Sequence, residues 1–143
     1  MLKIYRAGPL RASTEFAVRQ NRANARTHAE LLWELGFSVF CPHLNTDGMI
    51  GRLEDENRFI DGALLWLAHA DIVVALPGWR QSKGAKTEVN LATSLNLPVL
   101  HLLGSTSIII WWDKDRDKIL SRQQLLELST GNITLPNYER RQE

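Results

Sequence analysis

The run DIVVALP at residues 71–77 constrains the fold more strongly than any other stretch of the sequence. It places five apolar residues in a row, without the polar alternation of a strand that faces water on one side. Such continuous runs are typical of parallel strands that are buried on both faces. Parallel strands need long crossover connections, usually helices, so this run predicts an α/β fold.

Strand-like and helix-like segments alternate along the rest of the chain. Apolar runs predict further strands at residues 2–7, 37–41, 97–103 and 107–112. Apolar residues at helical spacing predict helices from Thr14 to Gly36, from Ile60 to Leu67 and from Ala85 to Leu95, and a last helix over 113–128. We therefore expect one flavodoxin-like or Rossmann-like α/β domain over residues 1–143, with a parallel sheet and helices on both faces.

The composition is that of an ordinary globular protein. The 143 residues are 44% hydrophobic and 23% charged with a formal net charge of +1, which gives no reason to expect binding to a nucleic-acid polymer. The single cysteine, Cys41, excludes an internal disulfide and fits a reducing compartment. No apolar stretch approaches the roughly 20 residues of a membrane helix, and the chain opens directly on a strand-like segment. We therefore expect a cytoplasmic protein that does not enter a membrane.

Three loops are the expected place for a ligand. In open parallel sheets, ligands bind beyond the carboxyl ends of the strands, where the following helices begin. This rule selects residues 7–14, 42–56 and 77–88, which hold most of the residues that suit catalysis or binding. The dinucleotide fingerprint GxGxxG and the Walker A motif are both absent from the sequence, so neither kind of phosphate-binding loop is expected.

The third loop, at residues 77–88, holds more residues suited to catalysis or binding than a strand-to-helix connection needs. Glu88 follows this loop, on the same helical face as Ala85. Its carboxylate is either a nucleophile directed into a cleft or an acid in the first turn of a helix. In the second case the helix dipole stabilises it by about 0.3–1 kcal/mol. Ser82 and Gly84 suit a phosphate or a sugar hydroxyl at a helix N-terminus, although an ordinary turn would look similar. Trp79 either stacks on a base or covers the sheet edge.

The other two loops offer weaker candidates. Gly8 and Pro9 shape a turn after the first strand, in which Tyr5 faces either the core or the cleft. His43 and Asn45 follow the second strand and are able to hydrogen-bond a base, although solvated loop positions are the simpler interpretation. A Cys-x-His spacing without a second pair is not a zinc motif, so no metal site is expected.

Residues 71–100, DIVVALPGWRQSKGAKTEVNLATSLNLPVL, resemble the signature stretch of the nucleoside 2-deoxyribosyltransferase superfamily. The resemblance is strongest to its small bacterial and phage branch, which carries a PGW..S.G...E loop and is related to the 2′-deoxynucleoside 5′-phosphate N-hydrolases. The opening KIYRAGPLR resembles the first strand and loop of the same group. Similarity covers residues 2–103, and the spacing from Ser82 through Gly84 to Glu88 is its most specific element.

The resemblance implies a covalent mechanism. In that superfamily the glutamate of this motif, here Glu88, attacks the anomeric carbon of a nucleoside and displaces the base. A second acid, eight residues before the aspartate that opens the third strand, helps to protonate the departing base. That position holds Ala63, and Asp61 lies two residues earlier, about 200° away around a regular helix. A start of this helix near residue 60, or a local shift in it, would bring Asp61 into place, so Asp61 is the expected second acid. Asp47 and Asp55 are the alternatives.

The implied activity is that of a nucleoside 2′-deoxyribosyltransferase, which moves the sugar between bases, with hydrolysis as the slower fate. One alternative is a 2′-deoxynucleoside 5′-monophosphate N-hydrolase, because Ser82 stands where typical transferases carry an aspartate that is hostile to a phosphate. Another is a non-catalytic nucleotide-sensing module, which the missing acid at Ala63 would fit.

The resemblance also implies partners and contacts. It implies a homo-oligomer with no metal or organic cofactor, which binds a nucleoside or nucleotide and a free base. Tyr5 and Trp79 are the expected contacts to base or sugar, and Ser82 is the expected contact to the 5′ end.

Overall fold

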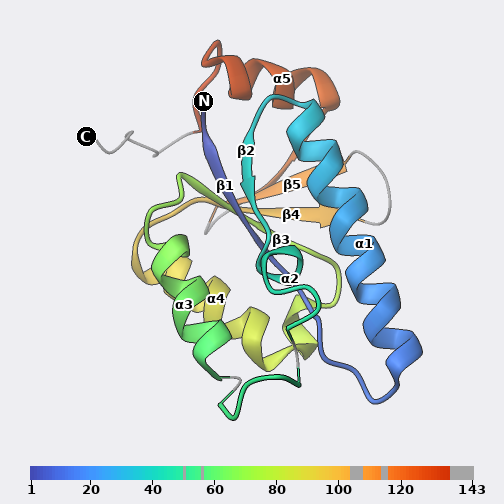
Figure 1. The fold of residues 1–143 in the computed structure, drawn as a ribbon. Coiled ribbons are helices and arrows are strands. Elements are labelled where there is room, and N and C mark those ends of the chain that lie inside the picture. The colour runs from blue at the N-terminus through green and yellow to red at the C-terminus, as the bar shows by residue number, and fades with distance from the viewer. Residues whose placement is uncertain (50, 56, 104–107, 114–115, 136–143) are drawn as a thin grey trace.

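In the part of the chain that the structure describes, six strands form one sheet in the order β2-β1-β3-β4-β5-β6. The computed structural model describes residues 1–135 except 50, 56, 104–107 and 114–115, and within 108–118 it describes only the backbone. The strands are β1 (Lys3–Ala7), β2 (Ser38–Phe40), β3 (Ile72–Ala75), β4 (Val99–Leu103), β5 (Ile108–Asp113) and β6 (Arg116–Leu120). As predicted, the strands from β2 to β4 in this order are parallel, and they lie between layers of helices (Figure 1).

Helices cover both faces of the sheet, as predicted. The helical elements are α1 (Glu15–Glu34), α2 (Pro42–Asn45), α3 (Asn57–Leu67), the 3-10 turn η1 (Trp79–Gln81), α4 (Lys83–Ser94) and α5 (Arg122–Thr130). On one face α1 and α5 share an apolar cluster with Ile4 and Val74, and on the other face α3 and α4 pack around Tyr5 and Val73. Neighbouring residues of β1 and β3 belong to opposite faces because side chains alternate along a strand. None of the helices described combines the length and the hydropathy that crossing a lipid bilayer requires.

Local sequence signals set the ends of the helices. Thr14 is the N-cap of α1, and its hydroxyl oxygen accepts a hydrogen bond from the Ala17 backbone N–H at 3.1 Å. Gly36, just after α1, has a φ of +91°, a conformation that glycine adopts without strain. Ser82 caps α4 in the same way as Thr14 caps α1, with 3.3 Å between its Oγ and the Ala85 backbone nitrogen. The predicted start of α1 at Thr14 and its end at Gly36 are confirmed.

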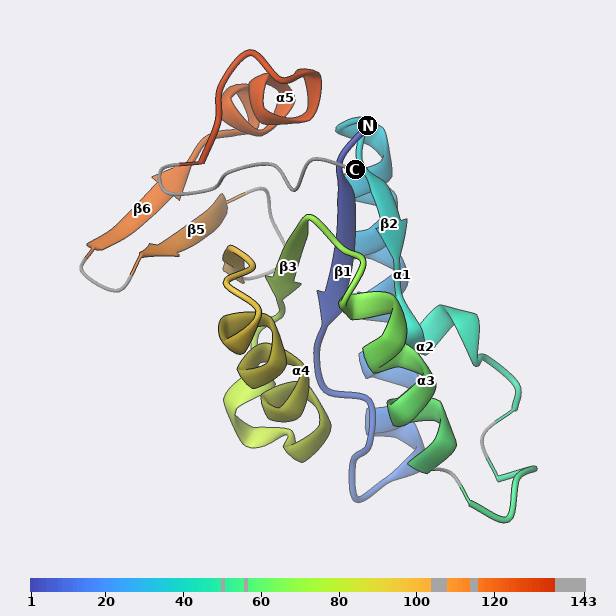
Figure 2. The same ribbon diagram turned by 90° about the vertical axis from the view of Figure 1, so that its left-hand side faces the viewer.

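The predicted last helix over 113–128 is wrong in its first half. Residues 116–120 form β6, which pairs antiparallel with β5, and β5 itself runs antiparallel to β4. Figure 2 shows β5 and β6 side by side at one edge of the sheet, next to α5. The connections after β4 and β5 are too short for a crossover helix, so these strands must run antiparallel.

The helix begins only after Ser121. The Ser121 side chain accepts from the Gln124 backbone N–H, and the Gln124 side chain accepts from the Ser121 backbone N–H. This capping box, Ser-x-x-Gln, is visible in the sequence and marks the true start of α5.

Gly8, directly after β1, lets the first loop pass close to the end of β3. A Cβ added at Gly8 would lie 2.8 Å from Cδ1 of Leu76, a separation that side chains do not tolerate without movement. Leu76 follows β3 and is itself buried, and its backbone N–H donates to the Ala7 carbonyl at 2.9 Å. Gly8 therefore allows the two chain segments to touch at the carboxyl end of the sheet.

We expect Gly8→Ala to lower the free energy of unfolding by about 1–3 kcal/mol, because the added methyl group overpacks the contact with Leu76. Gly62→Ala is the matched control, since a Cβ at this helical glycine meets no atom within 4 Å. That substitution should instead stabilise the protein by about 0.5–1 kcal/mol. Denaturant unfolding measures both variants, and equal stabilities would contradict the close approach at Gly8.

Candidate active site

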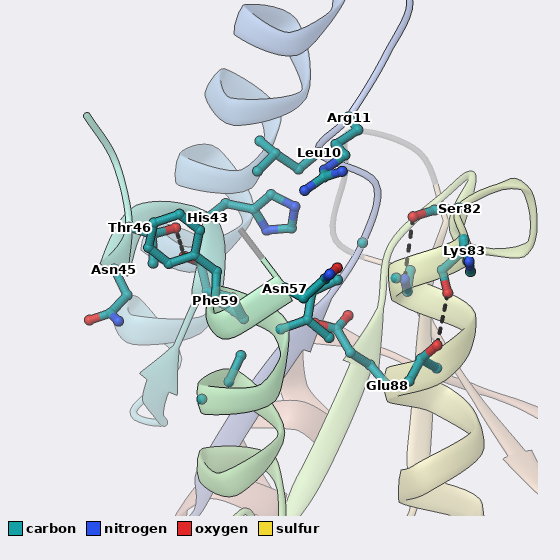
Figure 3. Close-up of a pocket in the computed structure, with 18 of the residues that line it drawn as sticks. Leu10, Arg11, His43, Asn45, Thr46, Asn57, Phe59, Ser82, Lys83 and Glu88 are labelled. Carbon is teal, nitrogen blue, oxygen red and sulfur yellow. Dashed lines mark hydrogen bonds between the residues drawn. The ribbon is translucent and has the colours of Figure 1, made fainter. Parts of the chain in front are cut away.

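A cavity of about 800 Å³ lies at the carboxyl ends of the central parallel strands. The loop after β1, the helices α2 and α3 and the start of α4 supply its walls, and Figure 3 shows their side chains around a common space. The volume falls within the range of about 300–1,000 Å³ that is usual for small-molecule sites. The cavity therefore has both the position that the parallel sheet predicts and the size that a nucleoside needs.

Glu88 lies at the floor of the cavity. Its side chain extends from α4 toward the wall that carries His43 and Asn57 (Figure 3), and the residue is only 7% exposed. The Tyr5 hydroxyl donates to Glu88 Oε1 at 2.7 Å, whereas Oε2 is buried and has no hydrogen-bond partner among the residues described. Burial raises the pKa of Glu88 to about 7, although the hydrogen bond from Tyr5 and the charge of Arg6 act in the lowering direction. Glu88 thus has one available oxygen and changes its protonation state near neutral pH.

An aromatic row runs from Glu88 to the mouth of the cavity. Tyr5 is fully buried, and both its burial and the neighbouring Glu88 charge raise the pKa of its phenol, so it stays a hydrogen-bond donor. Its ring stacks on Phe40 with the ring centroids 5.7 Å apart, and Phe40 stacks on Trp66 with the centroids 5.1 Å apart. Trp66 is 60% exposed, and both Phe40 and Trp66 line the cavity. The row Tyr5–Phe40–Trp66 therefore offers a flat apolar face on which another ring can stack.

His43 contributes a neutral polar group from α2. Its Nδ1 lies 3.1 Å from Arg6 Nη1, and because a guanidinium only donates, Nδ1 accepts and the ring proton lies on Nε2. Burial lowers the pKa of His43 to about 3, and the charge of Arg6 acts in the same direction. His43 is therefore a hydrogen-bonding group at physiological pH and not a proton-transfer group.

Basic side chains outnumber acidic ones around the cavity. Arg11, Arg58 and Lys83 line it and are exposed to solvent, whereas Glu88 is the single acid among the described residues of the lining. The Ser82 oxygen caps α4, which leaves its hydroxyl proton for a ligand. Negative charge on a ligand is therefore favoured at the α4 end of the cavity. Within the described part of the chain, no three His, Cys, Asp or Glu side chains gather as ligands for a metal ion.

Most residues predicted for the site lie around this cavity. Those that line it are Gly8, His43, Asn45, Ser82, Gly84 and Glu88. Tyr5 reaches it through the hydrogen bond to Glu88, whereas Pro9 lines a second, smaller cavity. Trp79 is buried beside the sheet, outside the lining, and its Nε1 donates to His101 Nδ1 at 3.2 Å. Its contact with a base stays a prediction that the geometry does not support.

Asp61 is exposed and is not part of the cavity lining. Helix α3 begins at Asn57 and continues through this position, so Ala63 faces the cavity and Asp61 does not, as the helical spacing predicts. The alternative of a late helix start is wrong. Asp47 forms an ion pair with an arginine of α1 at 3.0 Å, and Asp55 accepts from the Asn57 backbone N–H at 3.0 Å. The role of second acid stays a prediction for all three aspartates.

Two residues of the cavity wall, Phe40 and Trp66, are absent from the sequence-based prediction. Phe40 is the last residue of β2 and so belongs to the carboxyl edge that the parallel-sheet rule selects. Trp66 lies three residues after Ala63, on the same face of α3, so helical spacing was the signal that could have found it.

The profile of one protein family, described as a domain of unknown function (DUF4406), matches residues 2–101. The chain belongs to this family. No curated protein matches the sequence significantly.

Solved structures share the fold of this DUF4406 chain. A 2-deoxyribosyltransferase from the psychrotolerant bacterium Bacillus psychrosaccharolyticus gives a TM-score of 0.54 at 22% identity, over 69% of this chain and 70% of that one. A conserved protein from Enterococcus faecalis V583 gives a TM-score of 0.55 at 25% identity, over 75% of this chain and 66% of that one. The chain thus spans about two thirds of the length of these structures. The α/β fold that the sequence resemblance implies is confirmed.

Glu88→Gln tests the cost of burying the carboxylate. The pKa of Glu88 is about 4.5 in the unfolded chain and about 7 in the folded one. As the pH rises between these two values, the unfolded state loses the Glu88 proton first, so the free energy of unfolding falls. The uncharged variant should escape this fall and exceed the wild type by up to about 3 kcal/mol above the folded-state pKa. Denaturant unfolding at pH 4 and pH 8 measures the difference, which should be small at the lower pH. An advantage of equal size at both would show that Glu88 keeps an ordinary pKa.

Proposed function

We propose that this protein cleaves the N-glycosidic bond of 2′-deoxyribonucleosides and transfers the deoxyribosyl group to another base, with water as the slower acceptor. The observation that carries the proposal is the buried Glu88 carboxylate, whose Oε2 has no partner among the described residues, at the floor of a nucleoside-sized cavity. Glu88 also matches the glutamate of the superfamily motif in the PGW..S.G...E loop. The fold that this chain shares with a 2-deoxyribosyltransferase adds support.

Glu88 acts as the nucleophile through Oε2. Tyr5 holds Oε1, which orients the carboxylate and leaves a lone pair of Oε2 to form a bond to C1′ of the sugar. The bond between C1′ and the base nitrogen breaks with its electron pair, and this nitrogen takes up a proton from water in the cavity. A ring nitrogen of an incoming base then attacks C1′ and gives its N–H proton to the hydroxide left by the first step, and Glu88 leaves as a carboxylate. Only ionised Glu88 can start this sequence.

The aromatic row Tyr5–Phe40–Trp66 provides the stacking surface for the base. Phe40 already covers one side of the Trp66 ring, and the exposure of Trp66 leaves area for a planar ligand at the cavity mouth. A base on this face lies on the same row as Tyr5, whose hydroxyl holds the nucleophile. The same stacking row thus carries both the base and the residue that orients Glu88.

Trp66→Ala should raise KM for the nucleoside by about 5-fold to 150-fold, because stacking on an aromatic side chain contributes about 1–3 kcal/mol per base. Trp66→Phe keeps an aromatic face and should retain most of the affinity. Trp66 is 60% exposed, so neither change should disturb folding. Steady-state kinetics of the three proteins measure the effect, and an unchanged KM in Trp66→Ala would place the base elsewhere.

The basic lining favours a second candidate, a hydrolase of 2′-deoxynucleoside 5′-monophosphates. Arg11, Arg58 and Lys83 line the cavity, and Ser82 at the start of α4 offers a hydroxyl in place of a repelling carboxylate. A 5′-phosphate at this end would meet positive charge and a helix N-terminus together. The chemistry at Glu88 is the same for both candidates, and they differ in the acceptor and in the 5′ group.

One experiment separates these functions. The protein is incubated with deoxyadenosine or deoxyadenosine 5′-monophosphate, each with and without hypoxanthine, and the products are separated by chromatography. Transfer gives a new deoxynucleoside only with the acceptor, whereas the hydrolase releases base from the monophosphate alone. Glu88→Ala should lower turnover by at least about 10³-fold in either case. Ligand-induced thermal stabilisation without turnover would replace both by the nucleotide-sensing module.

The pH profile is the control for the role of Glu88. Turnover should rise with pH through about 7, as Glu88 ionises. Tyr5→Phe removes a hydrogen bond that lowers the pKa of Glu88, so the rise should move to higher pH in this variant. Superimposable profiles of the wild type and Tyr5→Phe would contradict the assignment of this ionisation to Glu88.

A further inference from the structure

A second cavity, of about 250 Å³, lies on the α1 side of the sheet. Arg6 of β1 and Asn24 and His28 of α1 line it, together with Pro9 and residues that follow β3. Arg6 is adjacent to Tyr5 in the sequence, and the alternation of side chains along β1 directs the two residues to opposite faces of the sheet. This small cavity is therefore separate from the one that contains Glu88.

A buried guanidinium dominates the small cavity. Arg6 is fully buried, and its Nη1 lies 3.3 Å from Cys41 Sγ and 3.1 Å from His43 Nδ1, neither of which is a carboxylate. Its Nε is buried and has no hydrogen-bond partner among the residues described. A guanidinium keeps its charge in proteins, and a buried charge is stable only when a counter-charge or hydrogen bonds compensate for its lost hydration. Arg6 therefore has an unpartnered Nε donor to offer to a ligand, and among the described residues no carboxylate is in direct contact with its charge, since Glu88 acts on it only from a distance.

The rest of the lining suits an anion. The Asn24 Oδ1 accepts from Gln20 Nε2 at 3.2 Å, so the NH2 group is the part of the Asn24 side chain that can donate to a ligand. Asn21 also lines the cavity, and its amide donates to the Leu10 carbonyl at 3.1 Å, which fixes its position. Within the described part of the chain no acidic residue lines this cavity.

We propose that the small cavity is a binding site for a small tetrahedral oxyanion, such as inorganic phosphate or sulfate, with Arg6 as its charged partner and Asn24 as a donor at its mouth. The volume of about 250 Å³ lies below the range of about 300–1,000 Å³ of typical small-molecule sites, so it suits a single oxyanion better than a whole nucleotide. The site is distinct from the one proposed for Glu88, because it lies on the other face of the sheet and its lining shares no residue with that of the large cavity.

Three variants that each lower the net charge by one test the site. Asn24→Asp places a carboxylate in the small cavity and should weaken phosphate binding at least 10-fold. Arg26→Gln is the matched control, since Arg26 lies about 200° from Asn24 around α1 and is exposed. Lys83→Gln probes the large cavity, where Lys83 is part of the lining. Arg26→Gln should bind phosphate as the wild type does, and Lys83→Gln should keep the binding that Asn24→Asp loses.

Isothermal titration calorimetry and thermal unfolding measure phosphate binding at constant ionic strength, with sodium chloride as the reference salt. Phosphate should raise Tm of the wild type, and Arg6→Met should abolish this shift; Asn24→Asp supplies the test if Arg6→Met does not fold. Absence of phosphate binding to the wild type, or its loss in Lys83→Gln but not in Asn24→Asp, would overturn the proposal. Equal stabilisation by chloride would also overturn it. None of these readouts depends on turnover, so they stand apart from the test of Glu88.

Discussion

A buried carboxylate with a single hydrogen-bond donor among the described residues is the constraint on which the rest of the site depends. Glu88 lies where α4 packs on the sheet, and its ionised form is tolerated there because Tyr5 donates to one oxygen and Arg6 places a positive charge nearby. Tyr5 and Glu88 are 83 residues apart in the chain, and β1 brings them together because it occupies the centre of the parallel strands. The chemistry of the cavity is thus a product of strand order.

Because side chains alternate along β1, its consecutive residues Tyr5 and Arg6 lie on opposite faces of the sheet and contact different cavities. Tyr5 holds the Glu88 carboxylate on the face covered by α3 and α4, and Arg6 faces α1 and the small cavity. Arg6 also acts across the sheet, since its charge helps to keep His43 neutral and lowers the pKa of Glu88. An anion beside Arg6 would weaken that field, so the two cavities are linked electrostatically although they share no wall.

Local sequence patterns predicted those features that depend on a single segment of the chain. The buried strand at 71–77, the start of the first helix at Thr14 and the placement of Glu88 beside Ala85 follow from local patterns. Residues 116–120 form β6 because they pair with β5, which overrides their local helical preference. The position of a residue in a loop does not predict where its side chain points. Trp79 lies next to the motif in sequence, but its ring packs in the core. The stacking of Phe40 on Trp66 joins two elements, so no single stretch of sequence displays it.

The exposed end of the aromatic row has an optical consequence. Trp66 is an indole at the mouth of the large cavity, and Phe40 stacks on one of its faces. A purine on the open face would quench its fluorescence, whereas Trp79, buried in the core with its N–H bonded to His101, would keep its emission. If the base stacks there as proposed, Trp66 is an intrinsic reporter of cavity occupancy, which registers a bound ligand whether or not a bond is broken.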